Sequence, residues 1–317
     1  MNSPPYLVSF NTIEDYIDCL SSPLRDAIEI ELRRLVCLNL PPIVSKRALA
    51  ILFGYSNTFV GSLLGRSDKY YREFIIKSGR KKRRIQAPRV ALKVIQKWFS
   101  FHLAKELTFE DHVYGFIPGR SSIDAAMKHC NSEWVYSFDI ENFFPTTKKE
   151  QVYDAIISIG YSSQGATIIT DLCCYNDHLA QGAPSSPLLS NLVMRPIDIK
   201  LKEIATRLDI TVTRYADDIT FSGTAEPPET LLSQVRSLFS NTSWSLAKSK
   251  QRLSIKNNGQ RLKVHGLLVD GNKPRLTKGY KNKIRAYKHL ISNNSVKESD
   301  LARILGHLKY AEQVSNK

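Results

Sequence analysis

The sequence predicts a mixed α+β protein, because helical and extended patterns alternate along its 317 residues. Apolar residues recur at helical spacing in the first hundred residues, and short segments rich in β-branched residues follow in the middle of the chain. The C-terminal region is basic and again helical in pattern. With 42% hydrophobic and 24% charged residues, the composition is that of a folded globular protein rather than a disordered tail or a coiled coil.

The first hundred residues predict mainly helices. Ser22 is expected to cap a helix that has Pro23 in its first turn and that ends before residues 41–42, which are both proline. A second apolar helix is expected over residues 45–53, and a third over residues 91–107.

A basic hairpin is predicted between the second and third helices. Residues 70–76 and 85–88 read as strands, and the run from Lys77 to Arg84 holds six Lys and Arg residues around the turn residue Gly79. The alternative is a bare nuclear-localisation run, which would not need flanking strands.

Three acids are expected at strand ends. Residues 134–140 alternate like a strand that ends near Asp139, while residues 210–222 read as a hairpin with Asp217 and Asp218 at its tip. Taken alone, such an acidic tip is most simply a solvated turn. If the strands are neighbours in one sheet, however, the carboxylates converge, and carboxylate oxygens are ligands that hard divalent cations prefer.

Positive charge is concentrated in one region. The chain carries a net charge of +15, and residues 230–297 hold fifteen Lys and Arg but only one acid, Asp270. This distribution indicates a polyanionic partner such as nucleic acid. Within the region, a helix over residues 280–291 has a tyrosine and isoleucine stripe, with three bases lying away from it: Lys281, Arg285 and Lys288.

A cytoplasmic protein with no membrane association is the expected class. The longest apolar stretch, residues 51–64, is interrupted by Gly54 and Gly61 and is shorter than the roughly 20 residues that a span needs. The N-terminus lacks the features of a signal peptide. Five cysteines without metal-binding spacing indicate reduced thiols, and Cys173 and Cys174 read as core residues.

Four motifs occur in a characteristic order: PGRS from Pro118, FDIENFFP from Phe138, QGAPSSP from Gln181 and YADD from Tyr215. With these motifs the chain resembles the bacterial reverse transcriptases, the group that contains retron and group II intron enzymes. The resemblance covers about residues 77–269 and implies a right-hand polymerase. Its expected parts are an N-terminal helical region (1–68), fingers and palm (69–229, the palm continuing to about 269) and a basic helical thumb (270–317).

The resemblance implies an RNA-directed DNA polymerase that uses divalent metal ions. Asp139 and Asp217 match the metal-binding aspartates of the palm, Asp218 stands beside them, and Ile140 would contribute its backbone carbonyl. Two Mg²⁺ ions are the expected cofactors, with Mn²⁺ as an alternative. Such ions activate the attacking hydroxyl and stabilise the leaving pyrophosphate in phosphoryl transfer.

The resemblance also implies residues that meet the incoming dNTP. Phe144 matches the aromatic gate that excludes a ribose 2′-OH, while Phe143 should point the other way on an extended strand and belong to the core. The motif glycine Gly182, beside Gln181, permits close backbone approach to the nucleotide. The remaining matches are a triphosphate-binding arginine, either Arg83 or Arg84, and Lys250 as the lysine that protonates pyrophosphate.

The length of the chain favours the retron enzymes, which are similarly short, because only residues 271–317 follow the palm. They carry an Asn-Ala-x-x-His segment and a Val-Thr-Gly motif, for which this chain has residues 125–129, ending in His129, and the triplet Val264, His265 and Gly266. His129 and the triplet are therefore candidates for contact with RNA, as is the basic helix. For His129, a core or capping role is the alternative.

The retron resemblance implies a cognate noncoding RNA as partner and template, synthesis that starts from a 2′-OH of an internal guanosine, and a covalent RNA–DNA product. It further implies an effector protein and a role in antiphage defence. Another bacterial reverse transcriptase, of the group II, diversity-generating or abortive-infection type, stays an alternative. So does a noncatalytic RNA-binding scaffold, which the intact aspartates argue against, and an RNA-dependent RNA polymerase, which would place a polar group at Phe144.

Overall fold

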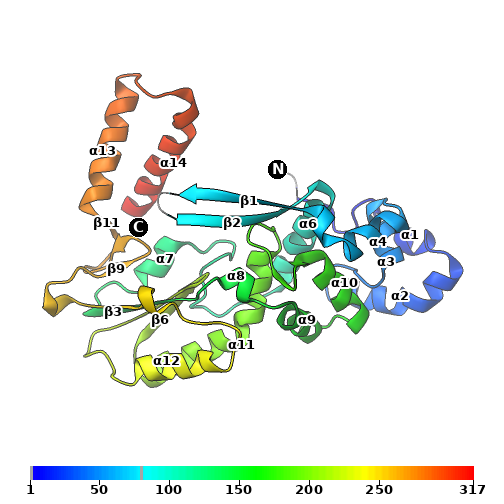
Figure 1. Ribbon diagram of the computed structural model, residues 1–317, viewed down its shortest axis with the longest axis horizontal. Helices are drawn as coiled ribbons and strands as arrows, with labels where there is room; N and C mark the ends of the chain where they lie inside the picture. Colours follow the sequence, from blue (N-terminus) through cyan, green and yellow to red (C-terminus); the bar gives the residue numbers. More distant parts are fainter. Residues whose placement is uncertain (1–2, 79–80) are drawn as a thin grey trace. The chain divides into compact units, whose positions relative to one another are not determined.

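A computed structural model describes residues 3–78 and 81–317 (Figure 1). The chain divides into two compact units, each built from two separate stretches of sequence. The two units comprise Met1–Phe109 with Asn142–Pro196, and Glu110–Glu141 with Ile197–Lys317. Helices and antiparallel sheets are both present, which confirms the predicted α+β class.

The first unit is mainly helical, as predicted. Its helices are α1 (Ile13–Asp18), α2 (Ser22–Cys37), α3 (Lys46–Phe53), α4 (Asn57–Gly65), α5 (Ser67–Tyr70), α6 (Val90–Glu106), α8 (Phe143–Thr146), α9 (Lys149–Ser158) and α10 (Ser163–Cys173). Helix α10 packs against α4, α6 and α9, and most of its side chains are buried. The longer helix α11 (Ser186–Arg207) starts in this unit and ends in the other.

Local capping explains the ends of the helices. Ser45 accepts a hydrogen bond from the Ala48 backbone N–H at the start of α3, and Gly54 ends that helix in a left-handed conformation with φ of 66°. Helix α2 differs from the prediction by one residue, because Ser22 is already helical and Ser21 occupies the cap position.

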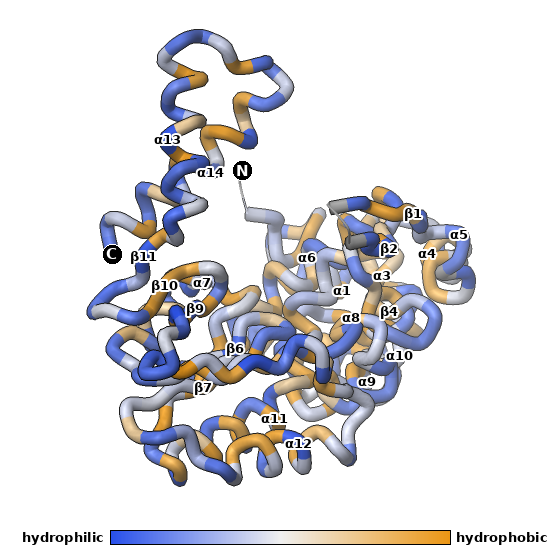
Figure 2. Tube along the Cα trace, turned by 60° about the vertical axis from the view of Figure 1, so that its left-hand side comes forward, coloured by the Kyte–Doolittle hydropathy of each residue, from blue (hydrophilic) through white to orange (hydrophobic). Residues whose placement is uncertain are grey.

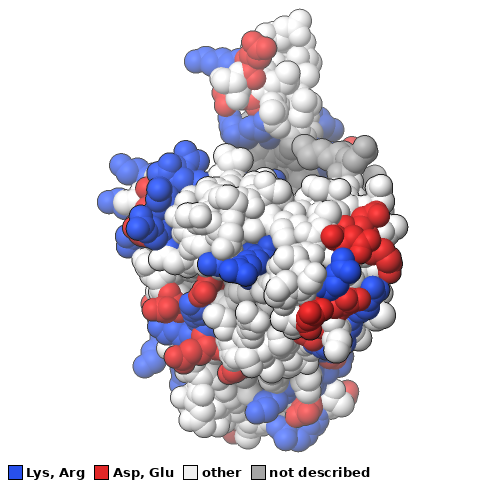
Figure 3. Space-filling model, turned by 90° about the vertical axis from the view of Figure 1, so that its right-hand side faces the viewer, with Lys and Arg blue, Asp and Glu red and all other residues white. Residues whose placement is uncertain are grey.

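The basic hairpin is confirmed as strands β1 (Tyr71–Ser78) and β2 (Lys81–Pro88), which pair antiparallel from Tyr71 opposite Pro88 onward. The predicted turn residue Gly79, with Arg80, lies outside the described residues. A second short hairpin in this unit joins β4 (Cys174–Tyr175) and β5 (His178–Leu179). Basic and acidic groups lie close together on the face shown in Figure 3, so neither sign of charge dominates there.

The second unit is built on an antiparallel sheet in the order β6-β7-β3-β8. Its strands are β3 (Trp134–Asp139), β6 (Thr211–Tyr215), β7 (Asp218–Gly223) and β8 (Arg252–Ile255). The predicted strand that ends at Asp139 is therefore a neighbour of the predicted acidic hairpin, because β3 pairs with β7 along its whole length.

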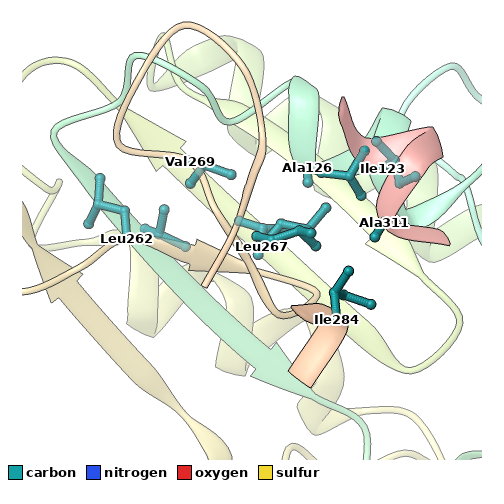
Figure 4. Packing of buried hydrophobic residues seen from close by; sticks show 11 residues of the cluster. Ile123, Ala126, Leu262, Leu267, Val269, Ile284 and Ala311 are labelled. Atoms are coloured by element: carbon teal, nitrogen blue, oxygen red, sulfur yellow. The ribbon is translucent and has the colours of Figure 1, made fainter. Parts of the chain in front are cut away.

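A small second sheet and a set of helices complete this unit. Their bounds are α7 (Ser122–Met127), α12 (Leu231–Ser240), β9 (Lys263–Val264), β10 (Leu267–Leu268), β11 (Arg275–Leu276), α13 (Lys278–Ser292) and α14 (Glu298–Ser315), with short 3₁₀ turns at Lys248–Lys250 and Lys256–Asn258. One apolar cluster joins α7, the second sheet, α13 and α14. Figure 4 shows Leu267 of β10 in this cluster, with Ile284 of α13 and Ala311 of α14.

Helices α13 and α14 pack against each other as an antiparallel pair (Figure 1). Hydrophobic and hydrophilic residues alternate along both helices (Figure 2), as expected for helices with one covered face. Ile284 is buried, while Tyr280 and Tyr287 lie against His307 of α14. The predicted tyrosine and isoleucine stripe of α13 is therefore covered largely by α14.

Within residues 3–78 and 81–317, no single helix is long and apolar enough to cross a membrane. Helices α3 and α4 meet this test of length and composition only together, as a pair bent by 117°.

All five cysteines are free thiols, and Cys173 and Cys174 are buried, as predicted for core residues. Burial raises the pKa of the Cys173 thiol to about 12. A thiol with so high a pKa is protonated near neutral pH and is a poor nucleophile.

Candidate active site

Three carboxylates gather at one end of the main sheet. The last residue of β3, Asp139, is the direct cross-strand partner of Asp218, the first residue of β7. Asp217 precedes Asp218 in the two-residue turn that connects β6 to β7, and its carbonyl accepts a hydrogen bond from the Ile140 N–H at 3.0 Å. The predicted convergence of these acids on one sheet end is thus present in the structure.

The turn that carries Asp217 has a tightly specified backbone. Ala216 adopts a left-handed conformation with φ of 58°, and Tyr215 pairs with Asp218 at the base of the turn. Gly115 packs directly on this turn, since a Cβ atom there would lie 2.3 Å from the Ala216 nitrogen. Only glycine fits at position 115 without a shift of the turn.

A buried ion pair also supports the turn, and the sequence analysis missed it. Arg214 donates from Nε and Nη2 to the two oxygens of the Asp198 carboxylate, at 2.5 and 2.6 Å, and from Nη1 to the Ala216 carbonyl at 3.0 Å. Both side chains are almost fully buried. The available signal was a lone arginine inside a β-branched strand, which needs a partner if it is buried.

The carboxylates perturb one another. Partial burial raises the pKa of Asp218 to about 6, and the charges of Asp217 and Asp139 contribute in the same direction. A carboxyl group with a raised pKa at a cluster of like charges is typical of a functional site.

Lys250 lies within this cluster. Its ammonium group is 2.5 Å from Asp139 Oδ1, and the Ala247 N–H donates to the Asp139 carbonyl at 2.8 Å, which anchors the 3₁₀ turn that carries the lysine. Burial lowers the pKa of Lys250, but the hydrogen bond to Asp139 and the carboxylate charges outweigh it, so the pKa is raised. Lys250 is therefore cationic near neutral pH.

The donor chemistry fits a divalent cation, although no set of three His, Cys, Asp or Glu side chains in the described part of the chain is already close enough to hold a metal ion. Asp139, Asp217 and Asp218 offer hard carboxylate oxygens, and after burial, the charges of Asp217 and Asp139 also contribute to the raised pKa of Asp218. The Lys250 ammonium neutralises part of the negative charge of these carboxylates in this structure.

His129 is an internal residue, which contradicts the expectation that it contacts RNA. Its side chain is fully buried, with Nδ1 2.7 Å from Ser222 Oγ and Nε2 2.7 Å from Thr213 Oγ1. Both ring nitrogens are thus occupied by hydroxyls of β6 and β7. Burial, with a smaller contribution from His265, lowers the pKa of His129 to about 3, so the ring is neutral.

The triplet of Val264, His265 and Gly266 forms the turn between β9 and β10. Val264 is buried in the apolar cluster, and the His265 side chain is only 8% exposed. This burial contradicts the expectation that these two side chains contact RNA. The His265 ring lies 5.1 Å from that of Tyr215, and its Nδ1 is 3.8 Å from Asp218 Oδ2. Gly266 is exposed.

In the first unit, the QGAPSSP motif contacts strand β2. The Gln86 N–H donates to the Gln181 carbonyl at 2.8 Å, and a Cβ on Gly182 would lie 2.8 Å from Ile85 Cγ2. Gly182 also has a φ of 123°, a conformation that other residues rarely adopt. The close backbone approach at this glycine is to strand β2, and the expected approach to the nucleotide stays a prediction.

The aromatic pair after Asp139 is helical rather than extended. Asn142 is left-handed, and Phe143 and Phe144 begin the single-turn helix α8. Phe143 is buried and Phe144 is half-buried, so the predicted division between a core and an accessible aromatic is found, although the expected strand is not. The left-handed conformation of Asn142 turns the backbone into α8, so Phe143 and Phe144 do not continue a strand.

The two candidate arginines lie on β2, and both are exposed. Arg84 forms an ion pair with Glu73 across the hairpin. Arg83 is opposite Ile76 in the register of the two strands.

The three bases predicted to contact nucleic acid lie together on α13. Lys281, Arg285 and Lys288 are exposed on α13 and line a groove of about 930 Å³, with Leu305 and Lys309 of α14 among the other lining residues. The groove combines an apolar floor with a basic rim.

Comparison with known proteins identifies the class. Residues 75–269 match the family described as reverse transcriptase (RNA-dependent DNA polymerase), so the chain belongs to this family and has its right-hand polymerase architecture. It is an RNA-directed DNA polymerase. The boundaries expected for the helical region, fingers, palm and thumb stay a prediction.

Within the family, the chain belongs with the retron reverse transcriptases. It is 30% identical over 259 residues to the Retron Ec86 reverse transcriptase of Escherichia coli, covering 80% of each chain. It is 28% identical to the Retron Mx65 reverse transcriptase of Myxococcus xanthus, over 74% of this chain and 58% of that protein. A solved telomerase structure from Candida albicans is similar with a TM-score of 0.47 and 10% identity, over 71% of this chain and 50% of that one.

Proposed function

We propose that the protein reverse-transcribes a structured noncoding RNA into a single-stranded DNA that stays covalently linked to the RNA, the product known as msDNA. The pairing of Asp139 with Asp218, with Asp217 in the adjoining turn, carries the catalytic part of this proposal. Similarity to retron reverse transcriptases supports the choice of template and product. Synthesis starts from a 2′-OH of an internal guanosine.

Members of this family use divalent metal ions, and we propose two Mg²⁺ ions here, with Mn²⁺ as a substitute. Asp139, Asp217 and Asp218, with the Ile140 backbone carbonyl, would hold them. When bound, such ions would acidify the attacking hydroxyl and offset the charge of the phosphates. The hydrogen bond from Ile140 to Asp217 and the strand pairing orient these residues before any ligand arrives.

The remaining active-site roles follow the same proposal. Phe144 excludes a ribose 2′-OH, and Gln181 with Gly182 supports the incoming dNTP. Arg83 or Arg84 binds its triphosphate. Lys250, held cationic beside Asp139, donates a proton to the pyrophosphate leaving group.

The groove on α13 and α14 is proposed to hold the nucleic acid. A-form duplexes are recognised through the phosphate backbone and 2′-hydroxyls, and the rim formed by Lys281, Arg285 and Lys288 supplies the charges for that contact. Gly266, which is exposed, stays a candidate backbone contact for the cognate RNA.

An effector protein and a role in antiphage defence are proposed from the retron resemblance alone. A cytoplasmic location is proposed because the chain has five unpaired cysteines, which are typical of a reducing compartment.

The decisive experiment is to purify the protein from its native host and sequence the nucleic acid that copurifies. A branched RNA–DNA species is the expected result, and it should be missing from an Asp217→Asn variant. Copurification of unlinked RNA alone, with no DNA, would instead support a noncatalytic RNA-binding scaffold. DNA without a covalent link to RNA would point to another type of bacterial reverse transcriptase.

A further inference from the structure

The turn between β9 and β10 holds a histidine in a strained conformation. His265 and Gly266 have φ of 48° and 81°, so both central residues of the turn are left-handed. This conformation is readily adopted by Gly, whereas at His265 it costs of the order of 1–2 kcal/mol. Such a residue persists only where its surroundings fix it.

The surroundings do fix it. Val264 and Leu267, which flank the turn and pair with each other, are almost fully buried in the cluster shown in Figure 4. The base of the turn is therefore anchored in the core, and the His265 side chain has a defined direction.

That direction leads to the aspartate hairpin. The His265 ring lies 5.1 Å from the Tyr215 ring at an interplanar angle of 53°, and Nδ1 is 3.8 Å from Asp218 Oδ2. Tyr215 and Asp218 are the cross-strand pair that closes the turn carrying Asp217. A single side chain thus contacts both residues at the base of the catalytic turn.

We propose that His265 is a positioning residue of the nucleotidyl-transfer site, whose ring holds Tyr215 and thereby sets the direction of the Asp217 and Asp218 carboxylates. This inference rests on the proposed role of these two aspartates. It assigns His265 to catalysis in place of the RNA contact expected from the sequence. Displacements of about 1 Å at a catalytic group cost about 100-fold in rate, so removal of the His265 ring should have a measurable effect.

Three variants separate the ring from the backbone. His265→Asn keeps a residue that tolerates the left-handed conformation but removes the ring. His265→Thr introduces the residue found in the retron motif, and His265→Phe keeps an aromatic ring without the nitrogens. Each variant is compared with the wild type by thermal unfolding, by kcat and KM for dNTP addition to a primed RNA template, and by Mn²⁺ binding without substrates.

We expect His265→Asn and His265→Thr to lower kcat by about tenfold or more, with KM and RNA affinity within about twofold. Mn²⁺ binding should weaken in the same two variants, and His265→Phe should restore both properties. The proposal is overturned by unchanged kcat and Mn²⁺ affinity, or by a kcat that falls only with the folded fraction. It is also overturned by a His265→Phe variant as defective as His265→Asn, or by a selective loss of affinity for the cognate RNA.

A parallel Asp217→Asn variant keeps the two proposals apart. If Asp217→Asn has wild-type activity, the proposed catalytic function itself fails. If Asp217→Asn is inactive while His265→Asn is fully active, only the positioning role fails.

Discussion

The ammonium group of Lys250 lies 2.5 Å from Oδ1 of Asp139, so the protein's own cation occupies part of the carboxylate cluster. The two residues are 111 positions apart in sequence, and the backbone contact between Ala247 and Asp139 holds them together. The Lys250 ammonium would compete with any divalent cation that Asp139 binds. Once released from Asp139, the same ammonium could donate a proton.

Removal of this ammonium should therefore strengthen cation binding. We expect Lys250→Ala to bind Mg²⁺ about twofold to fivefold more tightly without substrates, because a half-exposed ion pair is worth up to about 1 kcal/mol. Calorimetric titration measures this, and Lys250→Arg, which keeps the charge, serves as the control. The same Lys250→Ala variant should lose kcat. Weaker Mg²⁺ binding by Lys250→Ala would contradict the competition.

Gly115 should be intolerant of a side chain. A Cβ atom would meet the Ala216 backbone nitrogen at 2.3 Å, so Gly115→Ala must displace the turn that carries Asp217. We expect kcat to fall by about 10- to 100-fold and stability by about 1–3 kcal/mol. Kinetics and urea unfolding test this. Gly306→Ala in α14, where a Cβ has open space, is the control and should be stabilised by up to about 1 kcal/mol. Full activity in Gly115→Ala would refute the tight contact.

Acid should destabilise the protein through His129. Its pKa is about 3 in the folded protein against 6.5 for the unperturbed ring, so only the unfolded chain takes up a proton between these values. The free energy of unfolding is therefore not reduced by this group above pH 6.5. As the pH falls from 6.5 toward 3, protonation of the unfolded chain lowers the free energy of unfolding by about 1.4 kcal/mol per pH unit. Urea unfolding at pH 7, 6 and 5 should show a shallower pH dependence for His129→Gln than for the wild type. Equal slopes would mean that His129 is not buried in a neutral form.

Phe144 should control the choice of sugar. If its ring excludes the 2′-OH, Phe144→Ala should raise incorporation of ribonucleotides relative to deoxyribonucleotides by about tenfold or more. Single-nucleotide addition with matched dNTP and rNTP pairs measures the ratio. Phe143→Leu is the neighbouring control: it should lower stability, because Phe143 is buried, without altering the ratio. An unaltered ratio in Phe144→Ala would remove the gate assignment.

The basic rim of the groove should determine the salt dependence of nucleic-acid binding. Replacing Lys281, Arg285 and Lys288 by Ala should flatten the log–log salt slope by about 0.7 to 0.9 for each phosphate that is no longer neutralised. Binding of a primed RNA template at several salt concentrations tests this. Exposed Lys46 and Arg47 on α3 provide a control pair whose replacement should leave the slope unchanged. An unchanged slope in the triple variant would exclude this surface.

Local patterns were sufficient for most of the fold and for the acidic centre of the site. Alternation of side chains predicts the strand that ends at Asp139, and β-branched residues predict the hairpin that carries Asp217 and Asp218. Caps such as Ser45 with Gly54 predict helix ends. These features depend on neighbouring residues, so a single sequence carries them.

Other features depend on residues that are distant in sequence. The sequence leaves His129 between an RNA contact and a core role, and the choice depends on Thr213 and Ser222, which lie more than 80 positions away. The helical turn at Phe143 depends on one left-handed residue, Asn142, which alternation of side chains does not reveal. The division into interleaved units arises from contacts between remote stretches and leaves no local pattern.

The position of β3 in the sheet has a consequence for biosynthesis. It lies between β7 and β8, and both of these partners come later in the chain, beginning at Asp218 and Arg252. While a ribosome makes the chain, one edge of β3 lacks its partner until β7 begins, 79 residues after Asp139 (218 − 139), and the other until β8 begins, 113 residues after Asp139 (252 − 139). Neither unit, moreover, is a continuous fragment, since residues 110–141 interrupt the first and residues 142–196 interrupt the second. The nascent protein must therefore protect an apolar strand with two open edges, which is a hazard for aggregation that only the nearly complete chain removes.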